Sequence, residues 1–558
     1  MGDVRKGVDQ DVMAPGLPLV SPHPGRAGYP GFNPRREVAD GLVIDRDVSL
    51  RLRDGTTIYA DIFQPEGNEE PLPAILVWSA YGKHLRWFPL PGADVNFAAL
   101  SPHTVFECPD PVSLCERGYA YVAIDPRGVC MSDGDISVFT PQEGEDLYDT
   151  IEWIAAQPWC TGKVGMAGAS YYGFIQWRGG SVRPPHLCAL LIYDGLSDPY
   201  RELAFHAGIP NNKFMNGFAR SIAVTQNRQE DWHKAGAVHP FFDDYWKAKV
   251  APVEQMDVPL FVVSSWADHA IHTRGTLEAY KRAGSKQKWL EIHGRKKWMW
   301  MYRPETVKRQ IAFFDRFLKD TPNEVDSWPP VQLEVREEAN VGKFRIEQEW
   351  PLTRTVYIPL YLNGRARTMS LQPVTETSEL SYEATATEVS ATFEYAFPED
   401  TEITGHAKLR LWVSAEGSDD MDLFVALQKI DTKGKVVNFP YFSMHDDGQV
   451  ALGFLRVSHR ELDKTRSKPQ QPVLLHQREQ RLSPGEVVQV DIELWPQSTL
   501  FFKGERLKVL IKGTDIQSYE PPRLAAGHTM LRNAGHHIVH TGGRYDSHLL
   551  LPVVPSGH

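Results

Sequence analysis

The stretch that decides the fold is Val164-Gly165-Met166-Ala167-Gly168-Ala169-Ser170-Tyr171-Tyr172-Gly173. An apolar run ends here, a serine stands between small residues, and a segment of helical character follows. This order predicts a nucleophile elbow, a sharp strand-to-helix turn that lifts the hydroxyl of Ser170 above the edge of a sheet. The small residues Gly168, Ala169 and Gly173 let the backbone pass closely through such a turn. Because the last glycine stands three residues after the serine instead of two, the motif alone fits an ordinary tight turn equally well.

Similar apolar runs recur on both sides of this stretch. They lack the alternation of a half-exposed strand, which predicts parallel strands buried on both faces. The runs cover residues 74–79, 120–125, 164–168, 189–193, 260–264 and 289–293. Thr140-Pro141-Gln142-Glu143 fits a helix capping box, and Pro304 opens a second helix, so strands and helices alternate. This alternation predicts an α/β domain over residues 46–325.

The rest of the chain differs in character. Its 558 residues exceed what one hydrophobic core supports, so more than one domain is expected. Residues 1–45 are polar and rich in proline and glycine, which predicts an irregular extension. Residues 195–250 hold many aromatic side chains without a strong strand, which predicts a helical cap inserted in the α/β domain. Over residues 330–558 apolar and polar residues alternate, as in 488–494, and this period predicts an antiparallel β-sandwich.

The composition argues against several classes of function. The formal net charge is −11, whereas a nucleic-acid-binding protein usually carries a basic face, so no nucleic-acid partner is expected. No apolar stretch reaches the length of a membrane span, and residues 1–5 lack the layout of a signal peptide. The five cysteines form no CxxC pair, which argues against a zinc site or a disulfide framework. Reduced thiols favour a cytoplasmic location.

Further motifs accompany the elbow. Asp125-Pro126-Arg127-Gly128 precedes Ser132-Asp133-Gly134, and Gly162-Lys163-Val164-Gly165 leads into the elbow, which reads G-x-S-Y-x-G. Together these motifs resemble the CocE/NonD hydrolase family, which includes X-prolyl dipeptidyl peptidases and α-amino-acid ester hydrolases. The resemblance covers about residues 45–550. It implies an α/β-hydrolase domain with a helical cap, followed by a C-terminal all-β domain of the jelly-roll type.

Four residues are candidates for the chemistry around the elbow. Ser170 is the expected nucleophile, and the backbone N–H of Tyr171 is expected to point at the developing oxyanion. The resemblance implies that Asp268, in Trp266-Ala267-Asp268, is the carboxylate of a Ser–His–Asp triad, with a helix N-cap as its alternative role. It also implies that the hydroxyl of Tyr81 is the second oxyanion donor. A tyrosine that only packs its ring on the cap is the alternative.

The general base does not stand where the resemblance places it. Family members end the last sheet strand with G-x-W-x-H, but if Gly294 is the family glycine, Trp298 occupies the histidine position. The sequence therefore favours His293, at the end of that strand, as the base. His272 is the alternative, because it follows Asp268 by four residues, about one helical turn. His269 directly follows Asp268 and is expected to face away from it.

The leading functional hypothesis is a serine hydrolase that cleaves an ester or a small-acyl amide through an acyl-Ser170 intermediate. It needs no metal or organic cofactor. The aromatic residues of the cap suit a small-molecule substrate with an apolar acyl or alcohol part, and a homodimer is compatible with this reading. The alternatives are acyl transfer, lyase or cyclase chemistry in the same pocket, an X-prolyl-type aminopeptidase, or a binding protein with an inert triad. The basic run at residues 295–297 is read as a solvated loop, or else as a contact for an acidic substrate group.

Overall fold

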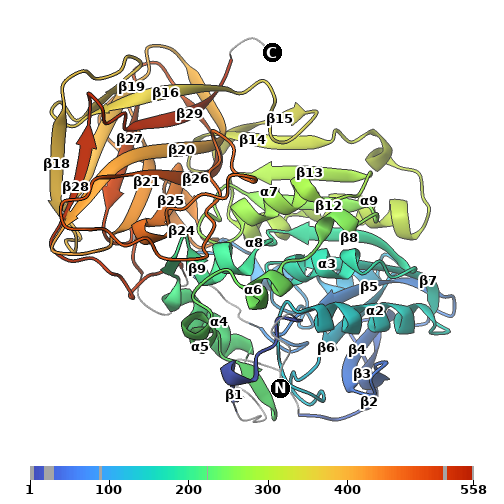
Figure 1. Ribbon diagram of the computed structural model, residues 1–558. Helices are drawn as coiled ribbons and strands as arrows, with labels where there is room; N and C mark the ends of the chain where they lie inside the picture. Colours follow the sequence, from blue (N-terminus) through green and yellow to red (C-terminus); the bar gives the residue numbers. More distant parts are fainter. Residues whose placement is uncertain (1–5, 18–30, 87–90, 223, 520–524, 556–558) are drawn as a thin grey trace.

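A twisted, largely parallel sheet forms the centre of the first half of the chain (Figure 1). The computed structural model describes residues 6–17, 31–86, 91–222, 224–519 and 525–555. The strand order is β2-β3-β4-β6-β5-β7-β8-β12-β13-β14-β15, and neighbouring strands run parallel from β6 to β14. The strands are β2 (Arg35–Ala39), β3 (Leu42–Arg51), β4 (Thr57–Pro65), β5 (Leu72–Trp78), β6 (Ala120–Asp125), β7 (Cys160–Ala169), β8 (Leu187–Tyr193), β12 (Leu260–Ser265), β13 (Lys288–His293), β14 (Val331–Glu338) and β15 (Val341–Glu347). Each apolar run that the sequence marks as a buried strand lies in one of these strands, apart from the last residue of the first run.

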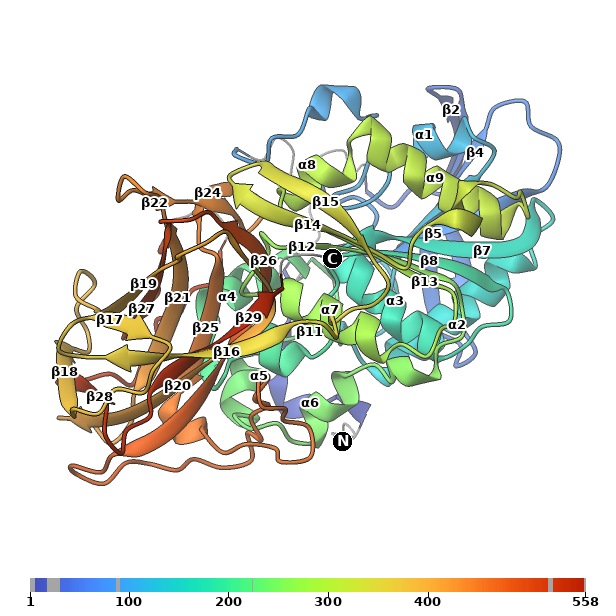
Figure 2. The ribbon, with the colours of Figure 1, turned by 90° about the horizontal axis from the view of Figure 1, so that it is seen from above.

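Helices cover both faces of this sheet (Figure 2). The helices are α1 (Pro111–Cys115), α2 (Pro141–Ala155), α3 (Tyr171–Ser181), α7 (Thr273–Arg282), α8 (Lys297–Met301) and α9 (Pro304–Leu318). In the view from above, α2, α3 and α7 lie on one side of the strands, and α1, α8 and α9 lie on the other. Two layers of helices, one on each face, with a buried parallel sheet between them make up an α/β domain.

The capping box at the start of α2 forms only in part. Thr140 Oγ1 accepts the Glu143 N–H at 3.3 Å, as the motif predicts. The Glu143 carboxylate does not return to Thr140, however. It turns into the core, where it accepts the indole N–H of Trp78 at 2.9 Å and the hydroxyl of Tyr171 at 2.7 Å. Its other oxygen accepts the Phe139 N–H at 2.7 Å, and the bond to the Tyr171 hydroxyl fixes the ring of the residue after the elbow serine.

The segment between β8 and β12 is a set of short elements rather than a helical bundle. It contains η4 (Tyr200–Ala204), β9 (Phe205–His206), β10 (Ile209–Pro210), α4 (Asn212–Ile222), β11 (Arg228–Glu230), α5 (Trp232–Val238), α6 (Asp244–Lys249) and η5 (Val253–Gln255). The amino-terminal extension is likewise not wholly irregular. It holds η2 (Gln10–Val12) and β1 (Met13–Pro15), and β1 pairs with β11. Residues 13–15 therefore gain their order from backbone pairing with the inserted segment, which composition does not reveal. Residues 35–39 and 42–45 belong to β2 and β3, so the main sheet begins before residue 46.

The C-terminal part is a β-domain of two antiparallel layers. One layer holds β17, β16, β29, β20 and β26, with β28 and β18 continuing from β20, and the other holds β19, β27, β21, β25 and β22. Apolar side chains of both layers meet in a second core, and β27 alternates between buried and half-buried residues. The strands are β16 (Val356–Asn363), β17 (Thr368–Ser370), β18 (Ser378–Glu383), β19 (Ala391–Ala396), β20 (Thr401–Glu416), β21 (Asp422–Ile430), β22 (Val436–Val437), β23 (Phe439–Tyr441), β24 (His445–Gly448), β25 (Ala451–Arg456), β26 (Val488–Phe501), β27 (Arg506–Lys512), β28 (His536–Thr541) and β29 (His548–Val554). Three short helical turns lie elsewhere in the chain: η3 (Phe97–Ala99), η6 (Glu324–Ser327) and η7 (Val457–His459).

Strand β14 joins the two parts. It pairs with β13 of the largely parallel sheet, and Arg336 near its end pairs with Thr499 of β26 in the β-domain. The side chain of Arg336 is 1% exposed and donates to the carbonyls of Ser498 and Val450. A hairpin of the β-domain also reaches the sheet edge, where the Phe442 N–H donates to the carbonyl of Ala267 at 2.8 Å. None of the helices among the described residues combines the length and apolarity of a membrane span.

Candidate active site

Ser170 stands at the corner between β7 and α3. Its backbone has φ 57° and ψ −116°, a conformation that L-residues rarely adopt and that costs about 1–3 kcal/mol. The corner is closely packed: a Cβ on Gly168 would lie 2.3 Å from Tyr172 Cβ, and one on Gly173 would lie 2.6 Å from the carbonyl oxygen of Tyr193. The glycines at these positions are therefore a steric requirement of the turn, and the turn exposes the serine hydroxyl at the edge of the sheet.

An imidazole and a carboxylate lie in line with this hydroxyl. Ser170 Oγ is 3.1 Å from His272 Nε2, and His272 Nδ1 is 2.6 Å from Asp268 Oδ2. Asp268 follows β12, and the chain then makes one turn, in which the His272 N–H donates to the Asp268 carbonyl at 3.1 Å. This turn carries the imidazole back over the carboxylate, just before α7 begins. The i, i+4 spacing between Asp268 and His272 was the signal for this arrangement in the sequence.

His293, which the sequence favoured as the base, does not contact the serine. It is the last residue of β13, so strand alternation fixes the direction of its side chain, and the ring is completely buried against Trp300 at 4.7 Å between centroids. Its Nδ1 accepts the Arg295 N–H at 3.2 Å, and its Nε2 has no hydrogen-bond partner. His269 bonds to the carbonyl of Pro496 in the β-domain at 3.0 Å and so faces away from Asp268, as expected. Of these three histidines, only His272 is placed to take a proton from Ser170.

Two hydrogen-bond donors flank the serine. The Tyr81 hydroxyl, on the loop after β5, is hydrogen-bonded with the Ser170 side chain, and burial raises the pKa of Tyr81 well above its ordinary value. The phenol therefore remains a donor at neutral pH. The Tyr171 N–H belongs to the first turn of α3, where backbone N–H groups have no partner within the helix. The Tyr81 ring also packs on Tyr171 at 5.6 Å, so the packing role weighed for Tyr81 exists alongside the hydrogen bond.

A buried lysine and a buried glutamate complete the charges of the site. The sequence suggested Lys297 only within a basic run that could contact an acidic substrate group, and it did not suggest Glu107. Lys297 Nζ lies 3.0 Å from Glu107 Oε1 and 3.5 Å from Asp268 Oδ2. Burial first, and then the charge of Lys297, lower the pKa of His272, while Asp268 works in the opposite direction. Burial works to raise the pKa of Asp268, but the charges of His272 and Lys297 outweigh it and hold that pKa below its usual value. At neutral pH the imidazole is thus a neutral acceptor beside an ionised carboxylate.

The basic run that holds Lys297 is not a solvated loop, contrary to the reading that the sequence favoured. Lys296 is 1% exposed and pairs with Asp94 and Asp446, and Arg295 pairs with Glu334 at 2.6 Å. Because these cations already have carboxylate partners within the chain, they offer no free positive charge to an acidic substrate. The nearest sequence signal is the position of Lys297, directly before the tryptophan that replaces the expected histidine.

The serine opens into a small, largely apolar cavity of about 40 Å³. Its walls come from the elbow, the loop after β5, helices α4 and α8, and the β-domain hairpin that carries Phe442. The lining residues are Tyr81, Phe106, Glu107, Ser170, Phe214, Gly217, Phe218, Ser221, Asp268, His272, Lys297, Trp298, Phe442 and Ser443. Other cavities are larger, including one of about 300 Å³ beside Tyr171, but none of the large ones contains the Ser170 side chain. Chemistry, rather than volume, therefore identifies the site.

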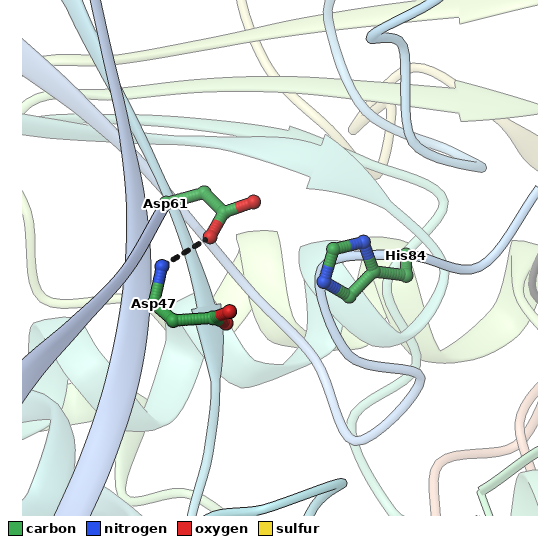
Figure 3. Close-up of side chains that lie close together, drawn as sticks. All are labelled: Asp47, Asp61 and His84. Carbon is green, nitrogen blue, oxygen red and sulfur yellow. Dashed lines mark hydrogen bonds between the residues drawn. The ribbon is translucent and has the colours of Figure 1, made fainter. Parts of the chain in front are cut away.

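A second cluster of ligand-type side chains shares no residue with the cavity that holds Ser170 (Figure 3). Asp47, Asp61 and His84 bring oxygen and nitrogen atoms within 4.8 Å of one another, close enough to hold a metal ion. The ammonium of Lys83, however, already lies among them, 2.5 Å from Asp47 and 3.0 Å from Asp61. A lysine thus supplies the positive charge that these buried carboxylates require, and we assign the cluster a structural role.

A serine at a strand-to-helix corner, aligned with an imidazole and a carboxylate on an α/β sheet, defines the chain as a serine hydrolase. The family model of the X-Pro dipeptidyl-peptidase (S15 family) matches residues 54–237, and that of the X-Pro dipeptidyl-peptidase C-terminal non-catalytic domain matches residues 323–550. A solved structure of a CocE/NonD family hydrolase from Staphylococcus aureus is 39% identical, with a TM-score of 0.88 over 92% of this chain and 94% of that chain. The protein therefore belongs to the CocE/NonD hydrolase family.

A more distant relative in sequence and a solved structure with the same fold are also similar to this chain. The cocaine esterase of Rhodococcus sp. (strain MB1 Bresler) is 23% identical over 91% of this chain and 98% of its own. An aminopeptidase from the marine sediment archaeon Thaumarchaeota archaeon shares the fold, with 16% identity and a TM-score of 0.71 over 92% of this chain and 97% of that chain.

Proposed function

We propose that this protein hydrolyses small esters through an acyl-Ser170 intermediate, with His272 as the general base. The single observation that carries the proposal is the continuous hydrogen-bond chain from the Ser170 hydroxyl through His272 to Asp268, at 3.1 and 2.6 Å. Both distances are within the range over which a base takes a proton from a nucleophile. The chain ends in a buried carboxylate, which holds the imidazole in the tautomer that leaves Nε2 free to accept.

The reaction then follows in two halves. As Ser170 Oγ attacks the carbonyl carbon, its proton passes to His272 Nε2, and the oxyanion accepts hydrogen bonds from the Tyr81 hydroxyl and the Tyr171 N–H. The imidazolium gives this proton to the leaving alcohol, and the acyl group stays on Oγ. A water molecule then transfers a proton to His272 and adds as hydroxide to the acyl carbon. The imidazolium then returns its proton to Ser170 Oγ as the bond between Oγ and the acyl carbon breaks, and the carboxylic acid departs.

The walls of the cavity favour an acyl group that is small and apolar. Phe218, Trp298 and Phe442 line the cavity together with the serine, and its volume is about 40 Å³. Apolar surface of this kind gains most from an apolar group, and a narrow pocket excludes long ones. The cocaine esterase relative supports an ester over an amide. The X-Pro dipeptidyl-peptidase family model keeps an X-prolyl-type aminopeptidase as the second candidate.

Three finer statements belong to the same proposal. The two antiparallel layers of the β-domain support a jelly-roll arrangement of its strands. The five cysteines are all free thiols, which supports a cytoplasmic location. Strand β15 pairs only with β14 among the described strands and exposes 37% of Phe344 and 61% of Ile346, which supports a homodimer through this edge. Light scattering of the intact protein tests the last statement.

The proposed reaction is tested with p-nitrophenyl esters of increasing acyl length. We expect turnover of the acetyl ester, a decline with longer chains, and loss of turnover in Ser170→Ala. A fluorophosphonate should label Ser170 in the wild type, and mass spectrometry of the tryptic peptide identifies the labelled residue. No labelling and no turnover would refute the hydrolase mechanism. Transfer of the acyl group to an added alcohol in place of water would favour an acyltransferase. Release of X-Pro dipeptides from a peptide substrate would favour the peptidase.

A further inference from the structure

The buried ammonium of Lys297 lies at the flank of the triad. Lys297 is the first residue of α8, which follows β13, and β13 is the strand next to β12, whose end leads to Asp268. The carboxyl ends of parallel strands meet at one edge of a sheet, so α8 starts beside Asp268. The Lys297 residue is only 3% exposed. A cation at such depth is costly unless carboxylates compensate it, so its position is set by its partners.

Lys297 shares a carboxylate oxygen with the base. Its Nζ is 3.5 Å from Asp268 Oδ2, and the same oxygen receives the His272 Nδ1–H at 2.6 Å. On the other side, Nζ is 3.0 Å from Glu107 Oε1, which also accepts the indole N–H of Trp298 at 3.0 Å. Glu107 therefore anchors both the lysine and the next residue of α8. The result is a fixed sequence of charges, Glu107–Lys297–Asp268, that ends at the imidazole.

We propose that Lys297 is a positioning residue for the triad, which anchors the Asp268 carboxylate and offsets its charge so that His272 stays neutral and correctly oriented. The proposal rests on the catalytic role of His272 proposed above. In an isolated Asp–His pair the carboxylate stabilises the imidazolium and makes the imidazole more basic. A cation on the same carboxylate oxygen weakens that effect. His272 then stays unprotonated, and able to accept the Ser170 proton, to a lower pH.

The other charged and titratable groups around His272 come from several elements. Asp268, Glu107 and Lys297 act on its pKa directly. Asp194, at the end of β8, acts on Asp268, and its own pKa is raised by burial first and then by the Asp268 charge, so it carries little negative charge at neutral pH. The hydroxyls of Tyr81 and Tyr441 have pKa values raised by burial and remain neutral. Among these groups, Lys297 is the cation that lowers the pKa of His272.

The test is the pH dependence of Ser170 phosphonylation by a fluorophosphonate, measured over about pH 5 to 9, because its acid limb reports the pKa of the base. In Lys297→Met we expect the acid limb to move to higher pH by about one unit, the size of effect that a neighbouring charge has on a buried group. In Glu107→Gln a negative charge is lost, and the limb should move in the opposite direction. Lys297→Arg keeps the positive charge and should keep the wild-type limb.

Lys296→Met is the matched control. Lys296 is the neighbouring residue and equally buried, but its partners are Asp94 and Asp446, which lie outside the catalytic cavity. Its loss should leave the acid limb in place, even if the melting temperature falls. A limb that stays fixed in Lys297→Met, or that moves the same way in Lys297→Met and Glu107→Gln, overturns the proposal.

Two results separate the failure of this inference from the failure of the hydrolase mechanism. A wild-type protein that the fluorophosphonate does not label contradicts the mechanism itself. A wild-type protein that is labelled, with variants whose acid limbs do not shift, contradicts only the role of Lys297. If Lys297→Met does not fold, the test uses Lys297→Arg and Glu107→Gln. The acid limb must then stay at the wild-type pH in Lys297→Arg and move to lower pH in Glu107→Gln.

Discussion

Replacement of His272 by alanine is the perturbation that separates the two histidines weighed as the base. The imidazole accepts the Ser170 proton at 3.1 Å, and no other histidine of the three candidates touches this hydroxyl. Loss of a positioned general base lowers kcat by about 10³- to 10⁴-fold, or about 4–5.5 kcal/mol of transition-state stabilisation. We expect a loss of this size in His272→Ala, with a small change in KM, because the imidazole acts on the proton transfer rather than on substrate binding.

His293→Ala is the matched comparison for this experiment. Its Nε2 has no hydrogen-bond partner and its ring stacks on Trp300, so the substitution should cost about 1–3 kcal/mol of stability and change kcat by less than about threefold. Turnover of p-nitrophenyl acetate is measured for both variants at equal concentrations of folded protein, checked by circular dichroism and urea unfolding. A His293→Ala variant that is folded but inactive, beside an active His272→Ala variant, would refute the assignment of the base.

Four further predictions follow from the same geometry. Tyr81→Phe removes one oxyanion donor and should lower kcat about 10²- to 10³-fold with little change in KM, as steady-state kinetics will show. The pH–rate profile of kcat/KM in the wild type should have its acid limb below pH 6.5. Burial and the charge of Lys297 lower the pKa of His272, and the imidazole acts as a base only when it is neutral. An acid limb above pH 6.5 would contradict this prediction. Gly173→Ala places a Cβ 2.6 Å from the Tyr193 carbonyl and should destabilise the fold by about 3 kcal/mol or more. Urea unfolding measures this loss, and a variant with wild-type stability would contradict the prediction. Lys83→Met leaves buried carboxylates without their cation and should cost about 3–5 kcal/mol near neutral pH. Because the Lys83 charge holds the pKa of Asp61 low against burial, that stabilisation is present above the ordinary carboxyl pKa and is lost as pH falls, so the deficit of the variant should shrink in acid.

The parts of the fold that sequence could predict are those that local chemistry dictates. Buried strands read as apolar runs because both of their faces are covered, and the elbow reads as small residues because any Cβ on Gly168 or Gly173 would collide with the backbone or with Tyr172. Both features depend on residues close together along the chain. The shared order of the extension and β11 depends instead on a pairing between Met13 and Glu230, which no local pattern encodes.

The residues of the candidate site also differ in whether local sequence could predict them. Ser170 and Tyr171 lie within one turn of chain, so a motif can find them. The choice between His272 and His293 depends on which way a strand end faces and on how the next loop turns, and this geometry is tertiary. The burial of Lys297 could not be predicted from the sequence. Its partner Glu107 lies in a loop before the elbow, whereas Lys297 lies well after it. A short basic run has the same composition whether it lies in solvent or carries the charge balance of a catalytic centre.

Strand β14 belongs to both halves of the molecule, and this limits how the two halves can be recombined in evolution. Since β14 continues the hydrolase sheet while its Arg336 is locked into the β-domain, and Phe442 supplies a wall of the catalytic cavity, neither half can be exchanged or shed without opening the other. Recombination that swaps the C-terminal half would have to import a compatible strand and a compatible wall together. We therefore expect the two halves to be inherited, and to unfold, as one unit.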